Sequence, residues 1–150
     1  MRALTLLLMF LAGCSSGSTV SEPARAQVPF ETIVQRSVPG GSGSERREVI
    51  RDETAWRAAW QELGAGGEPP AVDFASDMVI LAAMETQGCV SRVTIRSVVD
   101  AGSELVVDLL EAPPAPNCTC ITSERPFHAV RLRRSDEPAR FVAERGQTNC

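Results

Sequence analysis

Two segments in the second half of the chain alternate hydrophobic and polar residues. Residues 90–99 and 105–109 each show a period of two, which is typical of strands that bury one face. Residues 100–103 are the whole connection between them, and a connection this short joins antiparallel neighbours. We therefore predict a β-hairpin here.

The predicted hairpin has a definite register. It pairs Val99 with Leu105, Ile95 with Leu109, and Arg96 with Asp108. Ile95 and Leu109 are expected on the core face, and the two charged residues on the outer face. An exposed ion pair of this kind adds only about 0.2–1 kcal/mol to stability.

Other parts of the chain also predict strands. The run from Met78 to Met84 is apolar throughout, which suits a central strand, although its length also fits a turn of buried helix. Residues 126–133 predict a further strand, and residues 140–144 a short edge strand. Residues 31–38 and 45–52 flank a Gly- and Ser-rich stretch, which predicts a second hairpin.

One helix is predicted after Asp52, which can cap its N-terminus, and Gly64 stands where helices often end. Four residues share one helical face: Trp56, Ala59, Trp60 and Leu63. The two tryptophans are interpreted as core residues and not as a ligand-stacking pair, because Leu63 is the only other large apolar residue on this helix.

The elements together predict an α+β fold: one mostly antiparallel β-sheet with one short helix packed on a face, over residues 30–150. The 150 residues suffice for one domain, and 43% hydrophobic with 23% charged residues is typical of a soluble globular protein. The formal net charge of -4, with arginines scattered along the chain, argues against nucleic acid as a partner.

The N-terminal residues predict export. Residues 1–13 join one arginine to a short apolar run that ends in small residues, and this run is shorter than the ~20 residues that a membrane-spanning helix needs. We interpret them as a signal peptide. Residues 14–29 are rich in Ser, Gly, Ala, Pro and Thr and are expected to form a flexible tether.

The segment Leu11-Ala12-Gly13-Cys14 resembles the lipobox of bacterial lipoproteins. The resemblance implies cleavage before Cys14 and lipidation of that cysteine, so the protein is expected to be lipid-anchored in the cell envelope, with its domain facing the periplasm or cell surface. Ser15 after the cysteine favours the outer membrane if the source is Gram-negative. The alternative is a plain signal peptide with an incidental cysteine.

Four other cysteines remain: Cys89, Cys118, Cys120 and Cys150. Export makes oxidation the default state, so we expect two disulfides that brace the domain. A bridge between Cys118 and Cys120 would be strained by their close spacing, so each is expected to pair with Cys89 or Cys150, in either combination. A zinc site that adds His128 is the alternative, although Cys-x-Cys is an unusual zinc spacing.

Residues 112–125 predict a long, proline-rich loop that the cysteines fix, a combination that can present a rigid contact surface. Its candidate partner-binding residues are Pro113, Pro114, Pro116, Asn117, Thr119 and Arg125. A purely structural elaboration is the alternative. No enzyme activity and no cofactor are expected, because His128 is the one histidine and no nucleophile or acid partner lies near it in the sequence.

The order of elements from Asp52 to Arg133 resembles the C-terminal domain of PrcB-type proteins, accessory lipoproteins of a bacterial surface protease complex. The order and spacing of five features carry the resemblance: an initial hairpin, the capped aromatic helix, Val72-Asp73-Phe74 before an apolar strand, the glycine-containing turn Thr86-Gln87-Gly88-Cys89-Val90, and the strand that begins Pro126-Phe127. The resemblance implies a role in protein interaction.

The sequence thus predicts a non-enzymatic, lipid-anchored envelope protein that binds or stabilises another protein, with a protease complex as one candidate partner. The alternative is a small protease inhibitor or a ligand-binding lipoprotein that uses the loop at residues 112–125.

Overall fold

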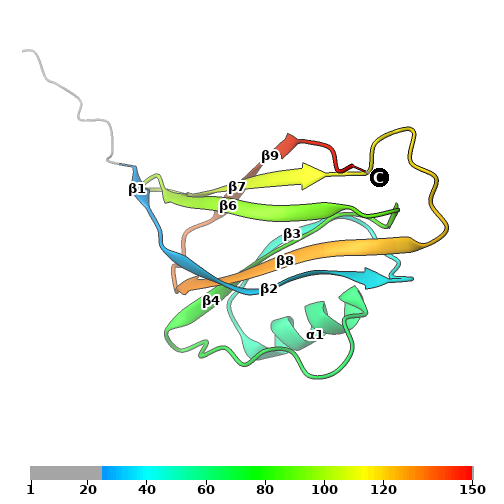
Figure 1. Ribbon diagram of the computed structural model, residues 1–150. Helices are drawn as coiled ribbons and strands as arrows, with labels where there is room; N and C mark the ends of the chain where they lie inside the picture. The colour runs from blue at the N-terminus through cyan, green and yellow to red at the C-terminus, as the bar shows by residue number, and fades with distance from the viewer. Residues whose placement is uncertain (1–24, 150) are drawn as a thin grey trace, which may run out of the picture.

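The computed structural model describes residues 25–149, which form two β-sheets and one helix (Figure 1). The elements are β1 (Ala26–Gln27), β2 (Phe30–Pro39), β3 (Arg46–Ile50), α1 (Glu53–Leu63), β4 (Asp77–Ala83), β5 (Gln87–Gly88), β6 (Arg92–Asp100), β7 (Leu105–Ala112), β8 (Ser123–Arg133) and β9 (Ala139–Arg145). The first sheet has the order β1-β6-β7-β9 and the second β2-β8-β4-β3, with the short β5 also paired to β8.

The fold is mostly β with one short helix, and β7 and β9 form its parallel strand pair. The prediction of one sheet was wrong, because the strands divide into two sheets packed face to face. Alternation along a strand shows that one face is buried, but it does not show whether the cover is a helix or a second sheet.

Strand β4 explains the layering of the molecule. Its even-numbered residues, Met78 to Ala82, belong to the core between the two sheets. Its odd-numbered residues, Val79 to Ala83, belong to a second core beneath α1. Both faces of β4 are therefore buried, which accounts for its unbroken apolar run and confirms the predicted central strand.

Helix α1 lies where the sequence predicts it and covers the outer face of the second sheet (Figure 1). The Asp52 carboxylate accepts a hydrogen bond of 2.8 Å from the Ala55 amide, and Gly64 ends the helix with a φ of 70°.

Both tryptophans of α1 are core residues, as predicted. Trp56 Nε1 donates to the carbonyl of Pro70 at 2.9 Å, and Trp60 Nε1 donates to that of Gly66 at 3.0 Å. Trp60 also packs edge-on against Phe127 of β8. The two indoles thus hold the connection after α1 against the second sheet.

The predicted hairpin of residues 31–38 and 45–52 was wrong. Strand β2 pairs with β8 and strand β3 pairs with β4, so the two strands form opposite edges of one sheet. The connection between them crosses the end of that sheet above Arg125, whose guanidinium donates to the carbonyls of Ser44 at 2.7 Å and Glu62 at 2.8 Å. Because Glu62 belongs to α1, the two bonds tie the helix and the connection to the same arginine of β8, and the bond to Ser44 holds the connection across that strand.

The hairpin of β6 and β7 is confirmed, with a register that the prediction matched in part. Ile95 pairs with Leu109 as expected, and an irregularity between Ile95 and Ser97 then shifts the remaining pairs by one residue. Asp108 consequently lies opposite Ser97, and Val99 lies opposite Val106 instead of Leu105.

The predicted contact between Arg96 and Asp108 nevertheless forms. Their side chains lie on the same face, and Arg96 Nη2 stands 2.9 Å from Asp108 Oδ1. Arg96 also reaches Glu144 of β9 at 2.7 Å, so one arginine links three adjacent strands.

The C-terminal end of the predicted tether, residues 14–29, overlaps a strand of the first sheet. Ala26 and Gln27 pair with β6, and the Val28 amide donates to the carbonyl of Val98 at 2.8 Å. These residues therefore belong to the first sheet. Residues 1–24, which hold the predicted signal peptide, Cys14 and most of the predicted tether, lie outside the described residues.

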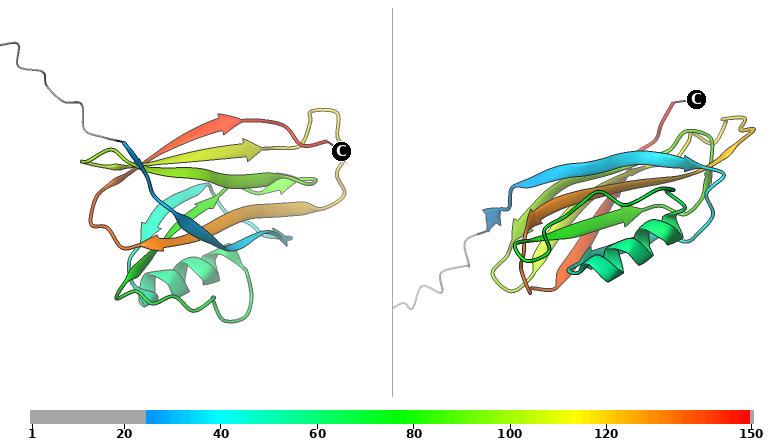
Figure 2. Two further views of the ribbon diagram at one scale, coloured as in Figure 1. Left: turned by 60° about the vertical axis from the view of Figure 1, so that its left-hand side comes forward. Right: turned by 90° about the horizontal axis from the view of Figure 1, so that it is seen from below.

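The remaining predicted strands are present as β8 and β9, the latter at the edge of the first sheet. The described chain begins at one end of the molecule, beside β1, and the connection between β7 and β8 projects at the opposite end (Figure 2).

Candidate functional site

A disulfide joins Cys89, just before β6, to Cys120 in the connection between β7 and β8, with their Cα atoms 4.8 Å apart. This bridge selects one of the two pairings that the sequence left open for Cys89. It is the one bridge described within residues 25–149, so the expectation of two goes beyond what is shown. Cys150 lies outside those residues, and a bridge from Cys118 to Cys150 stays a prediction.

Main-chain contacts fix the same region. The Cys89 amide donates to the carbonyl of Thr122 at 3.2 Å, and β5 pairs with the start of β8. Cys89 itself has a φ of 63°, a left-handed conformation that is unusual for a residue other than glycine. The disulfide and this hydrogen bond together hold the residue in that conformation.

The C-terminal tail completes this end of the molecule. The Thr148 amide donates to the carbonyl of Pro113 at 2.9 Å, and its hydroxyl donates to the carbonyl of Val90 at 2.6 Å. Three segments far apart in the sequence therefore form one surface, which we call the loop end: residues 87–91, 113–122 and 146–148.

The loop end exposes two large hydrophobic side chains. Ile121 is 96% exposed and Val90 is 61% exposed, and the third exposed large hydrophobic residue among residues 25–149 is Val142 of β9, at 43%. Residues 113–122 carry no charged side chain. The loop end is thus a rigid, uncharged surface with a protruding isoleucine.

The predicted partner-binding residues occupy different positions on this surface. Pro116, Asn117 and Thr119 are exposed, whereas Pro113 and Pro114 are half-buried against the tail. Arg125 is buried on β8 beneath the β2–β3 connection, so it does not contribute to the surface. Burial lowers the pKa of this arginine.

Sequence reasoning did not single out Ile121 or Val90. Ile121 carried a usable signal, because it is the one large aliphatic residue in a stretch otherwise made of proline, alanine, cysteine and polar residues. Val90 carried no such signal, because it stands directly before an alternating apolar pattern and was predicted to be the first residue of that strand.

His128 lies on β8 between the two sheets and is buried. Its Nδ1 accepts a hydrogen bond of 2.8 Å from the Ile95 amide of β6, and its Nε2 lies 3.0 Å from the hydroxyl of Thr32 on β2. Burial lowers the pKa of His128 to about 4, so the ring is neutral near pH 7. The bond from the Ile95 amide joins the two sheets, and the contact with Thr32 lies within the second sheet, so both nitrogens are engaged.

The zinc alternative lacks its ligands in this arrangement. Cys89 and Cys120 share a disulfide, and the nitrogens of His128 are already hydrogen-bonded. Over residues 25–149, no three His, Cys, Asp or Glu side chains are grouped as metal ligands would be.

Comparison with known proteins found no family model, no curated protein and no solved structure that matches this chain. None of the helices in the described part of the chain has the length and apolar character needed to cross a membrane.

Proposed function

We propose that this protein is a lipid-anchored, non-enzymatic envelope protein that binds or stabilises another protein through its loop end. The observation that carries the proposal is the pair of exposed side chains, Ile121 and Val90, on a backbone pinned by the Cys89–Cys120 bridge. A pinned loop loses little conformational entropy on binding, and uncharged, apolar surface is typical of the centre of a protein interface.

The position of the loop end suits an anchored binding protein. The described chain starts beside β1, at the end of the molecule opposite the loop end (Figures 1 and 2). With the lipid on Cys14, the residues up to Arg25 would reach about 40 Å at most when fully extended. The loop end would then be presented on the side of the domain away from the attachment point.

The resemblance to PrcB-type domains makes a protease complex one candidate partner. A specific observation also supports the alternative of a small protease inhibitor. Ile121 protrudes next to a bridged cysteine, and a rigid loop that offers one side chain can fill a specificity pocket of a protease without losing much entropy. The two functions use the same surface and differ in whether the bound protease loses activity.

Site-directed photocrosslinking in the intact envelope tests the proposal. A photoreactive residue at Thr119, which is exposed in the loop end, is expected to capture a defined partner in stoichiometric yield. The same residue at Val142, which is exposed on β9, is the matched control and is expected to capture little. Equal, diffuse labelling from both positions would contradict the proposal.

Two variants separate a specific contact from general stickiness. Ile121→Asp places a charge at the centre of the proposed contact and is expected to lower the yield from Thr119 at least tenfold. Val142→Asp changes an exposed apolar residue outside the loop end and is expected to leave the yield unchanged. Titratable inhibition of a captured protease by the purified protein, lost in Ile121→Asp, would favour the inhibitor alternative.

A further inference from the structure

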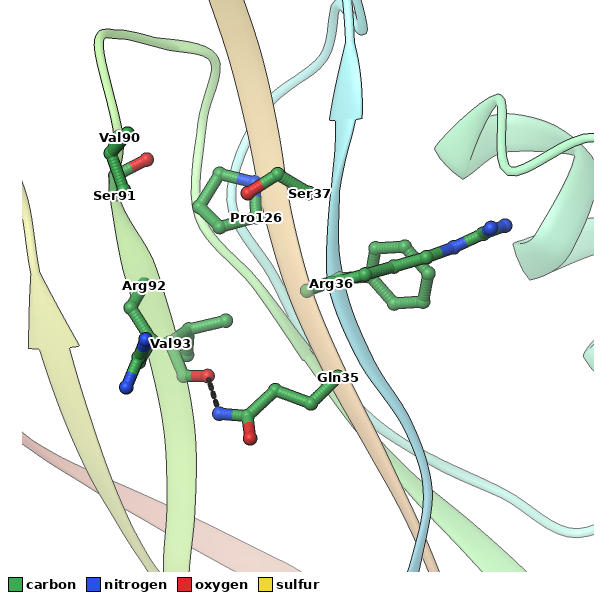
Figure 3. Close-up of a pocket in the computed structure, with 9 residues that line it drawn as sticks. Gln35, Arg36, Ser37, Val90, Ser91, Arg92, Val93 and Pro126 are labelled. Carbon is green, nitrogen blue, oxygen red and sulfur yellow. Dashed lines mark hydrogen bonds between the residues drawn. The ribbon is translucent and has the colours of Figure 1, made fainter.

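A groove with about 320 Å³ of open volume lies at the side of the molecule, between β2 and β6 (Figure 3). Pro126 and Phe127 of β8 contribute apolar lining, and Gln35 of β2 reaches across to β6. Val90 lines the groove and also belongs to the loop end, so the two surfaces are continuous.

The part of the β6 edge that lines this groove pairs with no strand among residues 25–149. On that side, β1 pairs only with Val99 and Asp100 at the far end of β6. Further along, side chains replace a strand: Gln35 Nε2 donates to the carbonyl of Val93 at 2.9 Å, and His128 Nδ1 accepts from the Ile95 amide. The backbone from Ser91 to Val93, next to these contacts, lines the groove.

The Val93 backbone shows which groups this edge presents. In an antiparallel strand, the N–H and C=O groups of one residue point to the same side. Since the Val93 carbonyl is directed at Gln35, the Val93 amide is directed at the groove as well. A chain lying in the groove would therefore meet main-chain hydrogen-bonding groups of β6.

Ser91 supplies an independent observation. Its side chain lines the groove and is 5% exposed, and its hydroxyl oxygen is buried with no hydrogen-bond partner in the described structure. A buried hydroxyl is normally hydrogen-bonded, so rotation of the Ser91 side chain toward the groove would let a chain on the edge of β6 satisfy this one.

The charge of the groove favours an acidic occupant. Its lining contains two arginines and no acidic residue. The guanidinium of Arg36 turns toward α1 (Figure 3). There it stacks on Trp60, 5.5 Å from the ring centre. Arg92 is exposed at the edge of the groove, where a carboxylate of a bound chain would be attracted to it.

We propose that an extended, acidic segment of a partner protein adds to the edge of β6 in this groove. Its main chain pairs with the backbone of Ser91–Val93, its polar groups satisfy the Ser91 hydroxyl, and a carboxylate lies near Arg92. Strand addition of this kind draws affinity from main-chain hydrogen bonds and specificity from side-chain contacts. The inference rests on the proposed function in needing a protein partner, and it specifies how that partner is held.

Peptide selection on the whole mature protein tests this inference. Linear decapeptides displayed on phage serve as the probe, and the enriched sequences are synthesised. We expect acidic residues in alternating positions, and amide protection from hydrogen exchange at Ser91 and Val93 when peptide is bound. A selection without enrichment, or peptides that protect β9 instead, would overturn the inference.

Substitutions then locate the contact. Arg92→Glu is expected to weaken peptide binding at least tenfold, and Ser91→Ala severalfold. Arg133→Glu reverses the charge of an exposed arginine at the far end of β8 and is the matched control, with unchanged binding. Thermal unfolding of each variant checks that it folds, and equal binding by Arg92→Glu and Arg133→Glu would contradict the inference.

The outcomes separate this inference from the proposed function. Partner capture at Thr119 that is lost in Ile121→Asp, together with no selected peptide, leaves the proposed function and removes the groove proposal. Peptides that bind at β6, together with no envelope partner captured at Thr119, would keep the groove proposal and remove the proposed function of the loop end. A dimer of the free protein that Arg92→Glu dissociates would identify a second copy as the occupant and contradict an acidic partner segment.

Discussion

His128 lies between the two sheets as a neutral hydrogen-bonding group. Its pKa is lowered by burial from 6.5 to about 4. Below pH 6.5 the unfolded chain therefore binds a proton at this position while the folded protein does not, so acid shifts the equilibrium toward the unfolded state. A proton on Nδ1 would also displace the bond from the Ile95 amide.

We predict that this residue makes the protein less stable as the pH falls from about 6.5 to 4, by about 3 kcal/mol in total, with no further contribution below that range. Urea unfolding at several pH values measures the loss. His128→Gln lacks the titrating ring, so its free energy of unfolding should fall less steeply over the same interval. Parallel curves for the two proteins would show that His128 does not carry the effect.

Arg125 makes a second residue-scale constraint, because its guanidinium lies directly beneath Gly43. A Cβ added at Gly43 would stand 2.6 Å from Arg125 Cζ, and the φ of +146° suits glycine alone. Gly40, in the same connection, also has a positive φ of +66° but open space around its missing Cβ.

We therefore predict that Gly43→Ala destabilises the fold by about 3 kcal/mol, whereas Gly40→Ala costs about 1 kcal/mol for the left-handed backbone alone. Denaturant unfolding of the two variants measures the difference. Equal losses would mean that Arg125 moves aside without cost and does not pin the connection.

At the scale of elements, prediction succeeded where the deciding contacts are local. Helix α1 follows from the Asp52 cap, the spacing of its tryptophans and Gly64, all within thirteen residues of sequence. The β6–β7 hairpin follows from alternation and a short turn. The irregularity at Arg96 moves the buried face from Val93 and Ile95 to Val98, and alternation did not reveal it because Val98 and Val99 are both apolar.

The β2–β3 error has a different cause. Both segments were correctly placed as strands, but their partners are β8 and β4, about 90 and 30 residues further along the chain. The contact that directs the connection comes from Arg125, which the sequence suggested as a surface residue. The β6 groove likewise depends on contacts that form only when distant segments meet.

The loop end also makes a prediction about its cysteines. The Cys118 amide donates to the carbonyl of Ala115 at 3.0 Å, and the Ala115 amide donates to that of Thr148 at 3.3 Å. These bonds place the loop that carries Cys118 beside the tail that leads to Cys150. We predict a second disulfide between these two cysteines in the exported protein.

Peptide mapping without reduction is the direct measurement. We expect one peptide pair that joins Cys89 to Cys120, a second that joins Cys118 to Cys150, and no thiol that reacts before reduction. Rapid alkylation of Cys118 in the folded, exported protein would contradict the second bridge. A Cys150→Ser variant should make Cys118 reactive and leave the first bridge unchanged.

For the molecule as a whole, an anchor, a domain and a binding surface were predicted, and the domain is the part that the structure describes. Helix α1 and the second core cover one face of the second sheet, the groove opens between β2 and β6, and the loop end lies at one end of the molecule. The number of sheets could not be derived from alternation, since a strand with one buried face serves equally well in one sheet or in a sandwich.

The anchor supplies the last prediction. Two or more acyl chains on Cys14 would hold the protein stably at the membrane, whereas a single chain would hold it weakly. Cys14 lies eleven residues before Arg25, where the described domain begins, so Cys14→Ala should leave folding and the loop end intact. We expect wild-type protein in the detergent phase of a phase-partition experiment and Cys14→Ala in the aqueous phase, with peptide binding unchanged. Wild-type protein that starts at Cys14, carries no lipid and partitions into water would show that export is retained but the anchor is absent.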